Sequence, residues 1–161
     1  MGTLPRTGRN EVVVDAPVAA VWDVVVDVTR TGEWSHECQR VEWLDGAHVA
    51  KVGARFVGRN RAGRFSWSRR SEIVRLEPGR EIVWKTIPTL VYRDSTEWSL
   101  LIEPAGDSRT RIVQSYQVLM INPIANRLFY LMVPQHRDRR PELNHDLLRI
   151  GEVANATTAA R

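Results

Sequence analysis

The sequence has almost no cysteine and no long apolar run. Cys38 is the only cysteine among 161 residues, which excludes an internal disulfide and predicts a reducing, cytoplasmic location. The longest apolar stretch, residues 128–133, is far shorter than the roughly 20 residues that span a bilayer. Residues 1–6 lack the apolar core of a secretory signal. We therefore expect a cytoplasmic protein without stable membrane insertion.

Motifs for several common chemistries are also missing. The sequence contains no glycine-rich phosphate loop and no nucleophile elbow. Its histidines fall in no zinc-binding spacing, so we expect no metal and no cofactor. The segment 35–38, Ser-His-Glu-Cys, carries reactive residue types, but it offers no third group to orient a nucleophile. We interpret it as the rim of a cavity at most, and catalytic residues stay unassigned.

Lysine is scarce, and arginine supplies nearly all the positive charge. Lys51 and Lys85 are the only lysines among 23 basic residues, and the net charge is +4. This balance permits anionic ligands, nucleic acid or acidic head groups without requiring any of them. The arginines of residues 55–64 indicate either a solvated basic edge or an anchor in which Asn60 or Arg61 points into a cavity. We interpret the cluster at residues 137–140 as a solvated face.

The first third of the chain predicts one strand followed by two short helices. Residues 11–14 form a β-branched run that ends at Asp15, which is expected to cap a helix beginning near Pro17. Apolar residues then recur at helical spacing up to Val28, and residues 29–34 predict a second short helical turn.

The middle of the chain predicts an antiparallel meander. Tight turns, and no helical pattern, separate strand-like segments at residues 41–44, 54–61, 65–76, 81–87, 94–102 and 110–120. Alternation is clearest along the last two segments. The positions expected to face inward are Thr96, Trp98, Leu100 and Ile102, then Ile112, Gln114, Tyr116 and Val118.

Helical periodicity returns after residue 122. Ile124, Leu128, Leu131 and Met132 mark one segment, and Leu143, Leu147, Ile150 and Ala154 mark a longer one. The predicted fold class is α+β: a curved antiparallel sheet of about seven strands wrapped around a long C-terminal helix, with two short helices after the first strand. We expect one domain over residues 9–155, with flexible tails at residues 1–8 and 156–161.

Short sequence motifs along nearly the whole chain resemble those of the START-like superfamily, also called SRPBCC. The resemblance rests first on residues 12–17 (Val-Val-Val-Asp-Ala-Pro). It rests also on Val21, Trp22, Asp23, Asp27 and residues 33–35, and on the sequences of the inter-strand turns at residues 75–80 and 101–104. It implies a helix-grip fold whose sheet and last helix enclose a cavity open at one end. The superfamily includes polyketide aromatase/cyclases, and it suggests an arginine that polarises a polyketide carbonyl, which residues 67–71 match only loosely.

Aromatic and polar residues of this sequence supply the candidate site. Tryptophan is abundant, with six residues, and each can line a pocket with rigid apolar area and one N–H donor. The predicted ligand-binding residues are Trp34, Asn60, Arg61, Trp67, Trp98, Gln114, Tyr116, Leu128 and Leu147.

Three functions remain open, in this order. The first is binding of a small hydrophobic or amphipathic molecule (a lipid, polyketide or aromatic metabolite) in an internal cavity. The second is a polyketide cyclase/dehydratase-type enzyme that uses arginine or tyrosine groups of that cavity. The third is a regulatory module or one that interacts with nucleic acid, which we rank last. The protein is expected to be a monomer or homodimer.

Overall fold

The computed structural model describes residues 2–161, which form one sheet and the helices that cover it. The strands pair antiparallel in the order β1-β7-β6-β5-β4-β3-β2. Their bounds are β1 Thr7–Val14, β2 Cys38–Trp43, β3 Arg55–Ala62, β4 Phe65–Glu77, β5 Glu81–Thr86, β6 Ser95–Pro104 and β7 Thr110–Met120. The predicted seven-stranded antiparallel sheet is confirmed.

The helices occupy the two ends of the chain. The short helix α1 and the 3₁₀ turn η1 follow the first strand, as predicted, and the longest helix, α3, lies at the C-terminus. Their bounds are α1 Val18–Val26, η1 Val28–Glu33, α2 Pro123–Met132, η2 Pro134–His136 and α3 Arg140–Ala159. Within residues 2–161, no helix combines the length and the apolar character needed to cross a membrane.

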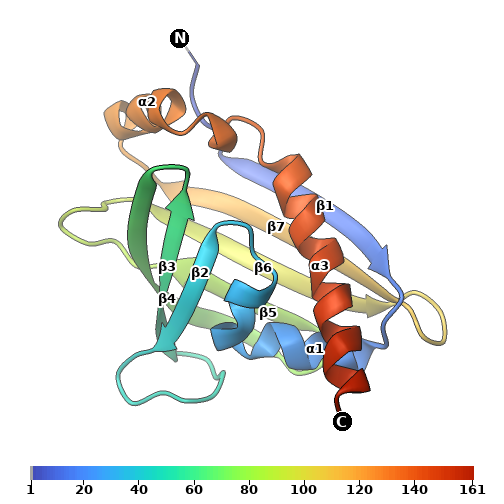
Figure 1. Cartoon of the computed structure of the whole chain (residues 1–161). Coiled ribbons are helices and arrows are strands. Elements are labelled where there is room, and N and C mark those ends of the chain that lie inside the picture. The colour runs from blue at the N-terminus through green and yellow to red at the C-terminus, as the bar shows by residue number, and fades with distance from the viewer. Residues whose placement is uncertain (1) are drawn as a thin grey trace.

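The sheet curves around α3, as Figure 1 shows. Strand registers shift between Cys38 and Arg40 in β2 and between Ile73 and Arg75 in β4. Such bulges bend a strand and increase its twist. Helix α3 crosses the inner side of the sheet (Figure 1), and α1 packs against the C-terminal part of α3. The most buried core side chains are Val21, Val24, Ile73, Ile82, Val83, Leu100, Ile102, Thr110, Ile112, Leu147 and Ile150.

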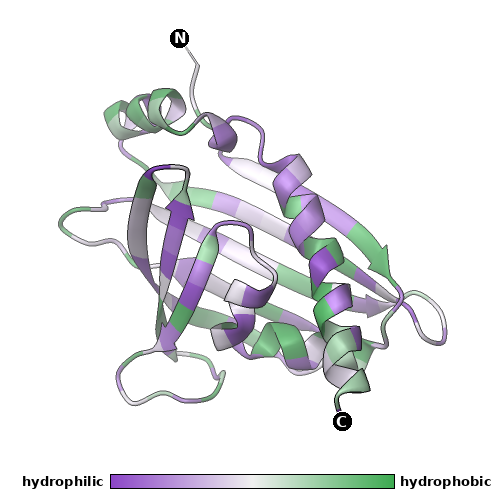
Figure 2. Ribbon diagram, viewed as in Figure 1, coloured by the Kyte–Doolittle hydropathy of each residue, from purple (hydrophilic) through white to green (hydrophobic). Residues whose placement is uncertain are grey.

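Alternation along β6 and β7 decides which side chains face α3. Leu100, Ile102 and Ile112 are fully buried, and Gln114 and Tyr116 are nearly so. The predicted inward registers of both strands are therefore confirmed. Helix α1 is hydrophobic along most of its length (Figure 2), which fits a helix held in place by burial.

Helix α2 leaves exposed the residues that its helical spacing marks as apolar. Ile124, Leu128 and Leu131 are all solvent-exposed, whereas Asn126 is buried and accepts a hydrogen bond from the Leu4 N–H at 2.8 Å. The helical spacing thus predicts the helix correctly, but its apolar residues face solvent. The reason is the position of α2 at one end of the sheet (Figure 1), where only one side of the helix contacts the rest of the protein.

Two details at element ends differ from expectation. Pro17 is the N-cap residue of α1 and forms no side-chain cap, while Asp15 pairs with Arg109 at 3.0 Å, so the predicted Asp15 cap is wrong. Asp15 lies two residues too early to reach the first turn. Strand β1 begins at Thr7 and α3 continues to Ala159, inside the segments expected as tails; the flexibility of those tails stays a prediction.

Candidate functional site

A cavity of about 230 Å³ lies between the curved sheet, the segment from η1 to β2, and the first turns of α3. Each strand contributes every second residue to the cavity wall, because alternate side chains point to the inner face of the sheet. The apolar side chains on its wall are Val25, Val28, Trp34, Val41, Phe56, Trp67, Trp84, Trp98, Leu100 and Leu143. The cavity therefore combines rigid aromatic and branched aliphatic groups with a larger number of polar and charged residues.

Most of the predicted site residues meet at this cavity. The antiparallel register places Asn60 of β3 opposite Trp67 of β4, on the same side of the sheet. The predicted residues that line the cavity are Trp34, Asn60, Trp67, Trp98 and Gln114. Tyr116 lines a second cavity, where its ring contacts the Trp98 ring with centroids 5.0 Å apart. Their role in ligand binding stays a prediction.

Arg61, Leu128 and Leu147 line neither of these two cavities, so their predicted placement is wrong. Arg61 follows Asn60 on an extended strand and points to the outer face, where its Nε–H donates to the Gly63 carbonyl at 3.2 Å. Leu147 is fully buried in the core, and Leu128 lies on the exposed side of α2.

Ion pairs cover part of the outer face of β3. Arg55 pairs with Glu72 at 2.8 Å, and Arg59 pairs with Glu42 at 3.3 Å. These carboxylates offset part of the positive charge of the hairpin, whose outer face is solvated and ion-paired; β3 itself lies between β2 and β4 and is not an edge strand.

The second cavity has a volume of about 150 Å³ and adjoins the first. Several side chains line both and so form a partition between them. These partition residues are Trp67, Arg69, Asp94, Thr96, Trp98, His136 and Arg139. Within the partition, the Arg139 guanidinium lies 5.2 Å from the centre of the Trp98 ring, and the His136 ring meets the Trp67 ring edge-on.

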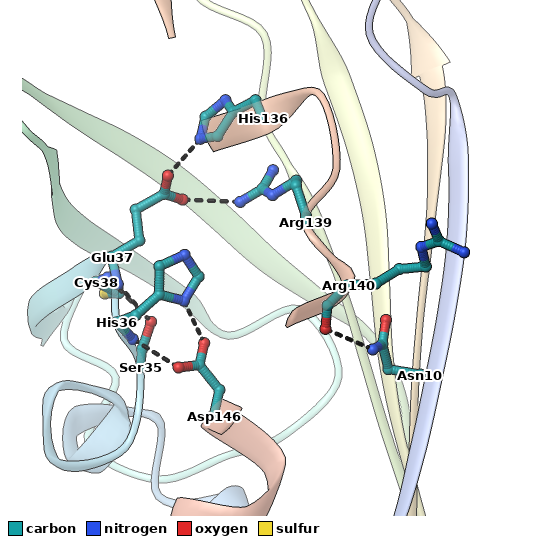
Figure 3. Close-up of polar contacts among 9 residues, drawn as sticks. All are labelled: Asn10, Ser35, His36, Glu37, Cys38, His136, Arg139, Arg140 and Asp146. Atoms are coloured by element: carbon teal, nitrogen blue, oxygen red, sulfur yellow. Dashed lines mark hydrogen bonds and ion pairs between the residues drawn. The ribbon is translucent and has the colours of Figure 1, made fainter. Parts of the chain in front are cut away.

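Glu37 ties the partition to the segment that precedes β2 (Figure 3). One of its carboxylate oxygens contacts His136 Nε2 at 2.5 Å, and the other accepts from Arg139 at 2.9 Å. The Glu37 side chain is only 13% exposed. Burial alone favours the neutral carboxyl, but the His136 hydrogen bond and the Arg139 charge outweigh it and lower the pKa of Glu37. The cluster therefore holds an ionised carboxylate inside the protein.

His36 and Asp146 form a second polar pair at the cavity. His36 Nδ1 lies 2.6 Å from one Asp146 oxygen, and the other oxygen accepts from the His36 backbone N–H at 2.8 Å. The Asp146 side chain is 3% exposed, whereas that of His36 is 29% exposed. The hydrogen bond to Asp146 raises the pKa of His36 against the opposing effect of burial.

Arg69 reaches the cavity from β4. In the strand register Arg69 lies opposite Gly58 of β3, so both residues are on the inner face of the sheet. Arg70, the next residue, lies opposite Val57 and is exposed. The Arg69 guanidinium donates to the Asp94 carboxylate at 2.7 Å and to the Asp94 carbonyl at 2.9 Å. The strand register thus decides which of the two adjacent arginines faces the interior.

Several buried polar atoms on the cavity wall lack a hydrogen-bond partner within residues 2–161. They are the indole N–H of Trp34, the Nε–H groups of Arg69 and Arg139, and the side-chain oxygen of Gln114. A buried donor or acceptor without a partner costs free energy, about 1–3 kcal/mol in typical cases. Neighbouring atoms close these groups off even from water-sized molecules, so the folded protein carries this cost.

Cys38 lies on the wall but is a poor nucleophile. Burial raises the pKa of its thiol to about 11, so the reactive thiolate is scarce near neutral pH. In the part of the chain that the structure describes, no group of three or more histidine, cysteine, aspartate or glutamate side chains is placed to hold a metal ion.

Sequence reasoning placed His36 and Glu37 at the rim of a cavity, and both line the larger cavity, but it missed their partners His136, Arg139 and Asp146. These partners lie about a hundred residues away in the chain, and no local pattern reports such contacts. The interpretation of Arg139 as part of a solvated face is wrong, because its side chain is only 18% exposed. One signal was present: Asp146 falls three residues after Leu143, on the apolar stripe of α3, where a charge needs a partner.

Comparisons with known proteins agree with this architecture. A family model described as polyketide cyclase/dehydrase and lipid transport matches residues 6–139. The Polyketide_cyc-like protein Cgl2372 from Corynebacterium glutamicum is 26% identical, with a TM-score of 0.59 and coverage of 96% of this chain and 94% of that one. The ZhuI aromatase/cyclase from Streptomyces sp. R1128 has 18% identity, a TM-score of 0.67, and coverage of 96% and 97%.

Protein TTHA0849 from Thermus thermophilus is 17% identical, with a TM-score of 0.69 and coverage of 94% of this chain and 99% of that one. No curated protein sequence is similar enough to the chain to count as a relative. At these identities, the likeness to the ZhuI and Thermus structures is a likeness of fold.

Proposed function

The chain belongs to the polyketide cyclase/dehydrase and lipid transport family, and we propose that it binds a small hydrophobic or amphipathic molecule in the 230 Å³ cavity. The observation that carries this proposal is the cavity itself, with tryptophan and aliphatic groups on its wall. An engineered cavity of about 150 Å³ with apolar walls binds benzene. A cavity of this larger size accommodates a molecule of about two fused rings.

Polar side chains on the same wall, among them Asn60, Arg69 and Thr86, favour an aromatic ligand that carries oxygen. A phenol or carbonyl oxygen accepts hydrogen bonds from N–H and O–H donors of such side chains, and a phenolic O–H donates to their oxygens. An alkyl chain makes no such hydrogen bonds. We therefore propose an oxygenated aromatic or polyketide-like molecule rather than a simple fatty acyl chain. The lone Cys38 fits a reducing compartment, and we propose a cytoplasmic location.

A cyclase-type activity is the second candidate. Charged and titratable groups on the same wall favour it, since His36, Arg69 and Arg139 all line the cavity. An inert carrier has no need of charged groups in contact with its ligand, because burying them opposes folding.

Filling the cavity from β3 is expected to weaken binding strongly without unfolding the protein. Gly58 lines the cavity, and a Cβ placed there would lie 3.4 Å from the Cys38 sulfur, within ordinary contact. The side chain in Gly58→Leu would then occupy ligand space. We expect the affinity for 2-naphthol, measured by titration calorimetry, to fall at least about tenfold, a loss of roughly 1.4 kcal/mol.

Arg59→Leu is the matched control, because it adds the same side chain to the exposed face of the same strand. Its affinity for 2-naphthol should match that of the wild type, and thermal unfolding should show that both variants are folded. Equal binding by the Gly58→Leu variant would place the ligand elsewhere and contradict the proposal. A parallel titration with decanoate tests the preference for an aromatic ligand, which should bind more tightly.

A further inference from the structure

One end of the molecule gathers exposed apolar side chains. The antiparallel order of the strands brings the end of β7, the β5–β6 loop and the β3–β4 turn to this end, and α2 lies beside them (Figure 1). Clustered exposed apolar residues mark interaction sites, whereas single ones are ordinary. The side chains that define this surface, which we call the apolar end, are 40–90% exposed: Ile124, Leu128, Leu131 and Met132 of α2, and Leu90 and Val91 of the β5–β6 loop.

Contacts on the inner side of α2 fix which side of this helix faces outward. Asn126 is buried and accepts a backbone hydrogen bond, and Phe129 lines the second cavity. Ile124, Leu128 and Leu131 recur at helical spacing and so share the opposite side of the helix. Burial of this apolar stripe therefore requires a body outside the part of the chain that the structure describes.

Exposed arginines surround the apolar end, and they lie on α2 and on the segments beside it. These arginines are Arg6, Arg64, Arg93, Arg127 and Arg137. None of the five forms an ion pair within residues 2–161, and carboxylates of the same region already have partners. Asp94 contacts Arg69 at 2.7 Å, and Asp138 contacts Arg140 at 2.9 Å. The protein itself therefore leaves the positive charge around the apolar end without a counter-charge.

The opposite end of the sheet differs, because arginines there are paired. Arg75 contacts Glu81 at 2.8 Å beside the β4–β5 turn, and Arg109 of the β6–β7 turn contacts Asp15 at 3.0 Å. The net charge of +4 is thus unevenly distributed. Unpaired positive charge and exposed apolar area coincide at one end of the molecule.

We propose that the apolar end docks on the surface of an anionic lipid membrane, with α2 lying in the plane of the head groups. Helices that bind in this way combine an apolar side, which enters the lipid by about 5–10 Å, with basic residues beside it. Helix α2 has 10 residues and is about 15 Å long, so it lies on a bilayer and cannot cross one. This docking is peripheral and goes beyond the proposed function, because it needs no ligand in either cavity.

Charge complementarity and apolar area together select this occupant. A second copy of the chain would bring two sets of unpaired arginines face to face, and like charges oppose such contact. A nucleic acid offers phosphates to the arginines, but its phosphates leave the aliphatic side chains of α2 in water. An anionic lipid surface meets both needs, because its phosphates accept from guanidinium groups and its acyl chains bury the leucine and isoleucine side chains.

The test is cosedimentation of the full chain with lipid vesicles. Vesicles of phosphatidylglycerol and phosphatidylcholine in equal amounts provide the anionic surface, and phosphatidylcholine alone provides the neutral one. We expect the wild-type protein to bind the anionic vesicles and to stay in solution with the neutral ones. Binding should weaken strongly at about 1 M salt, where the Debye length falls to about 3 Å.

A pair of double variants tests the apolar contribution. Ile124→Ser/Leu128→Ser should weaken binding to the anionic vesicles at least about tenfold, because two aliphatic side chains no longer enter the lipid. Val49→Ser/Val52→Ser is the matched control, since both valines are exposed on the β2–β3 loop at the other end of the sheet. Its affinity should equal that of the wild type.

A pair of single variants tests the charge. Arg127→Gln should weaken binding to the anionic vesicles about fivefold, the contribution of one basic residue near such a surface. Lys51→Gln removes the same charge from the exposed β2–β3 loop and should bind like the wild type. Thermal unfolding should show that all four variants are folded, since each replaced residue is exposed.

Three results would overturn the proposal. The first is a wild-type protein that fails to bind the anionic vesicles at low salt. The second is an Ile124→Ser/Leu128→Ser variant that binds them as tightly as the wild type, because arginines alone would then hold the anion, as they would hold a nucleic acid. The third is a wild-type dimer that this double variant dissociates, which would assign the apolar end to a second copy of the chain.

Discussion

Replacing Gly151 by leucine is expected to cost the protein at least about 3 kcal/mol, the upper range for overpacking a close contact. Gly151 is buried on α3, and a Cβ there would lie 2.6 Å from Val14 Cβ of β1, far inside ordinary contact distance. Neither backbone can yield easily, because β1 is hydrogen-bonded to β7 and α3 packs along β1. The helix would have to move off the sheet.

Thermal unfolding measures this loss, with a Tm lowered by roughly 6–12 °C for a chain of this size. Gly151→Ala should show a smaller decrease, since the better helix propensity of alanine offsets about 1 kcal/mol of the clash. Glu152→Leu is the control, because it adds leucine to the exposed side of the same helix. If Gly151→Leu were as stable as this control, the close approach of α3 to β1 would be refuted.

Replacing Glu37 by glutamine is expected to destabilise the protein by about 3 kcal/mol, which is typical for removing one partner of a buried ion pair. The change preserves shape but leaves Arg139 charged and without its carboxylate. Arg139 and His136 both belong to the partition between the cavities. We therefore expect the partition to loosen along with the loss of stability.

The destabilisation caused by Glu37→Gln should depend on pH. The pKa of Glu37 is lower in the folded protein than in the unfolded chain. The stability that the Glu37 carboxylate contributes is therefore fully present above the unfolded pKa of about 4.3 and is lost as the pH falls through the folded pKa. Urea unfolding of wild type and Glu37→Gln should differ most at neutral pH and converge in acid. Glu152→Gln, an exposed glutamate of α3, should match the wild type throughout. A constant difference at every pH would mean that the carboxylate charge is not what stabilises the cluster.

Local signals were sufficient to predict the sheet and its helices. Turn residues at positions such as Gly63 and Gly79 separate the strands, and both adopt positive φ angles that favour glycine. Alternation along β6 and β7 correctly placed Leu100, Gln114 and Tyr116 on the inner face. These signals act within a few residues, so a single sequence carries them.

The polar part of the site was not predictable in the same way. The contacts of His36 with Asp146 and of Glu37 with His136 join segments that only the finished fold brings together. Side-chain direction also depends on strand parity: Arg61 was expected near the ligand, yet Arg69 occupies the inner face because it pairs with Gly58. A one-residue difference in register reverses such assignments.

The most direct test of the cavity is a titration of the uniformly ¹⁵N-labelled protein with 2-naphthol, observed through the indole N–H signals of its tryptophans. Trp34, Trp67, Trp84 and Trp98 line the cavity, whereas Trp22 and Trp43 do not. The account predicts shifts for the first group and constant signals for the other two. Equal shifts in both groups, or none at saturating 2-naphthol, would contradict a ligand-binding cavity between the sheet and α3.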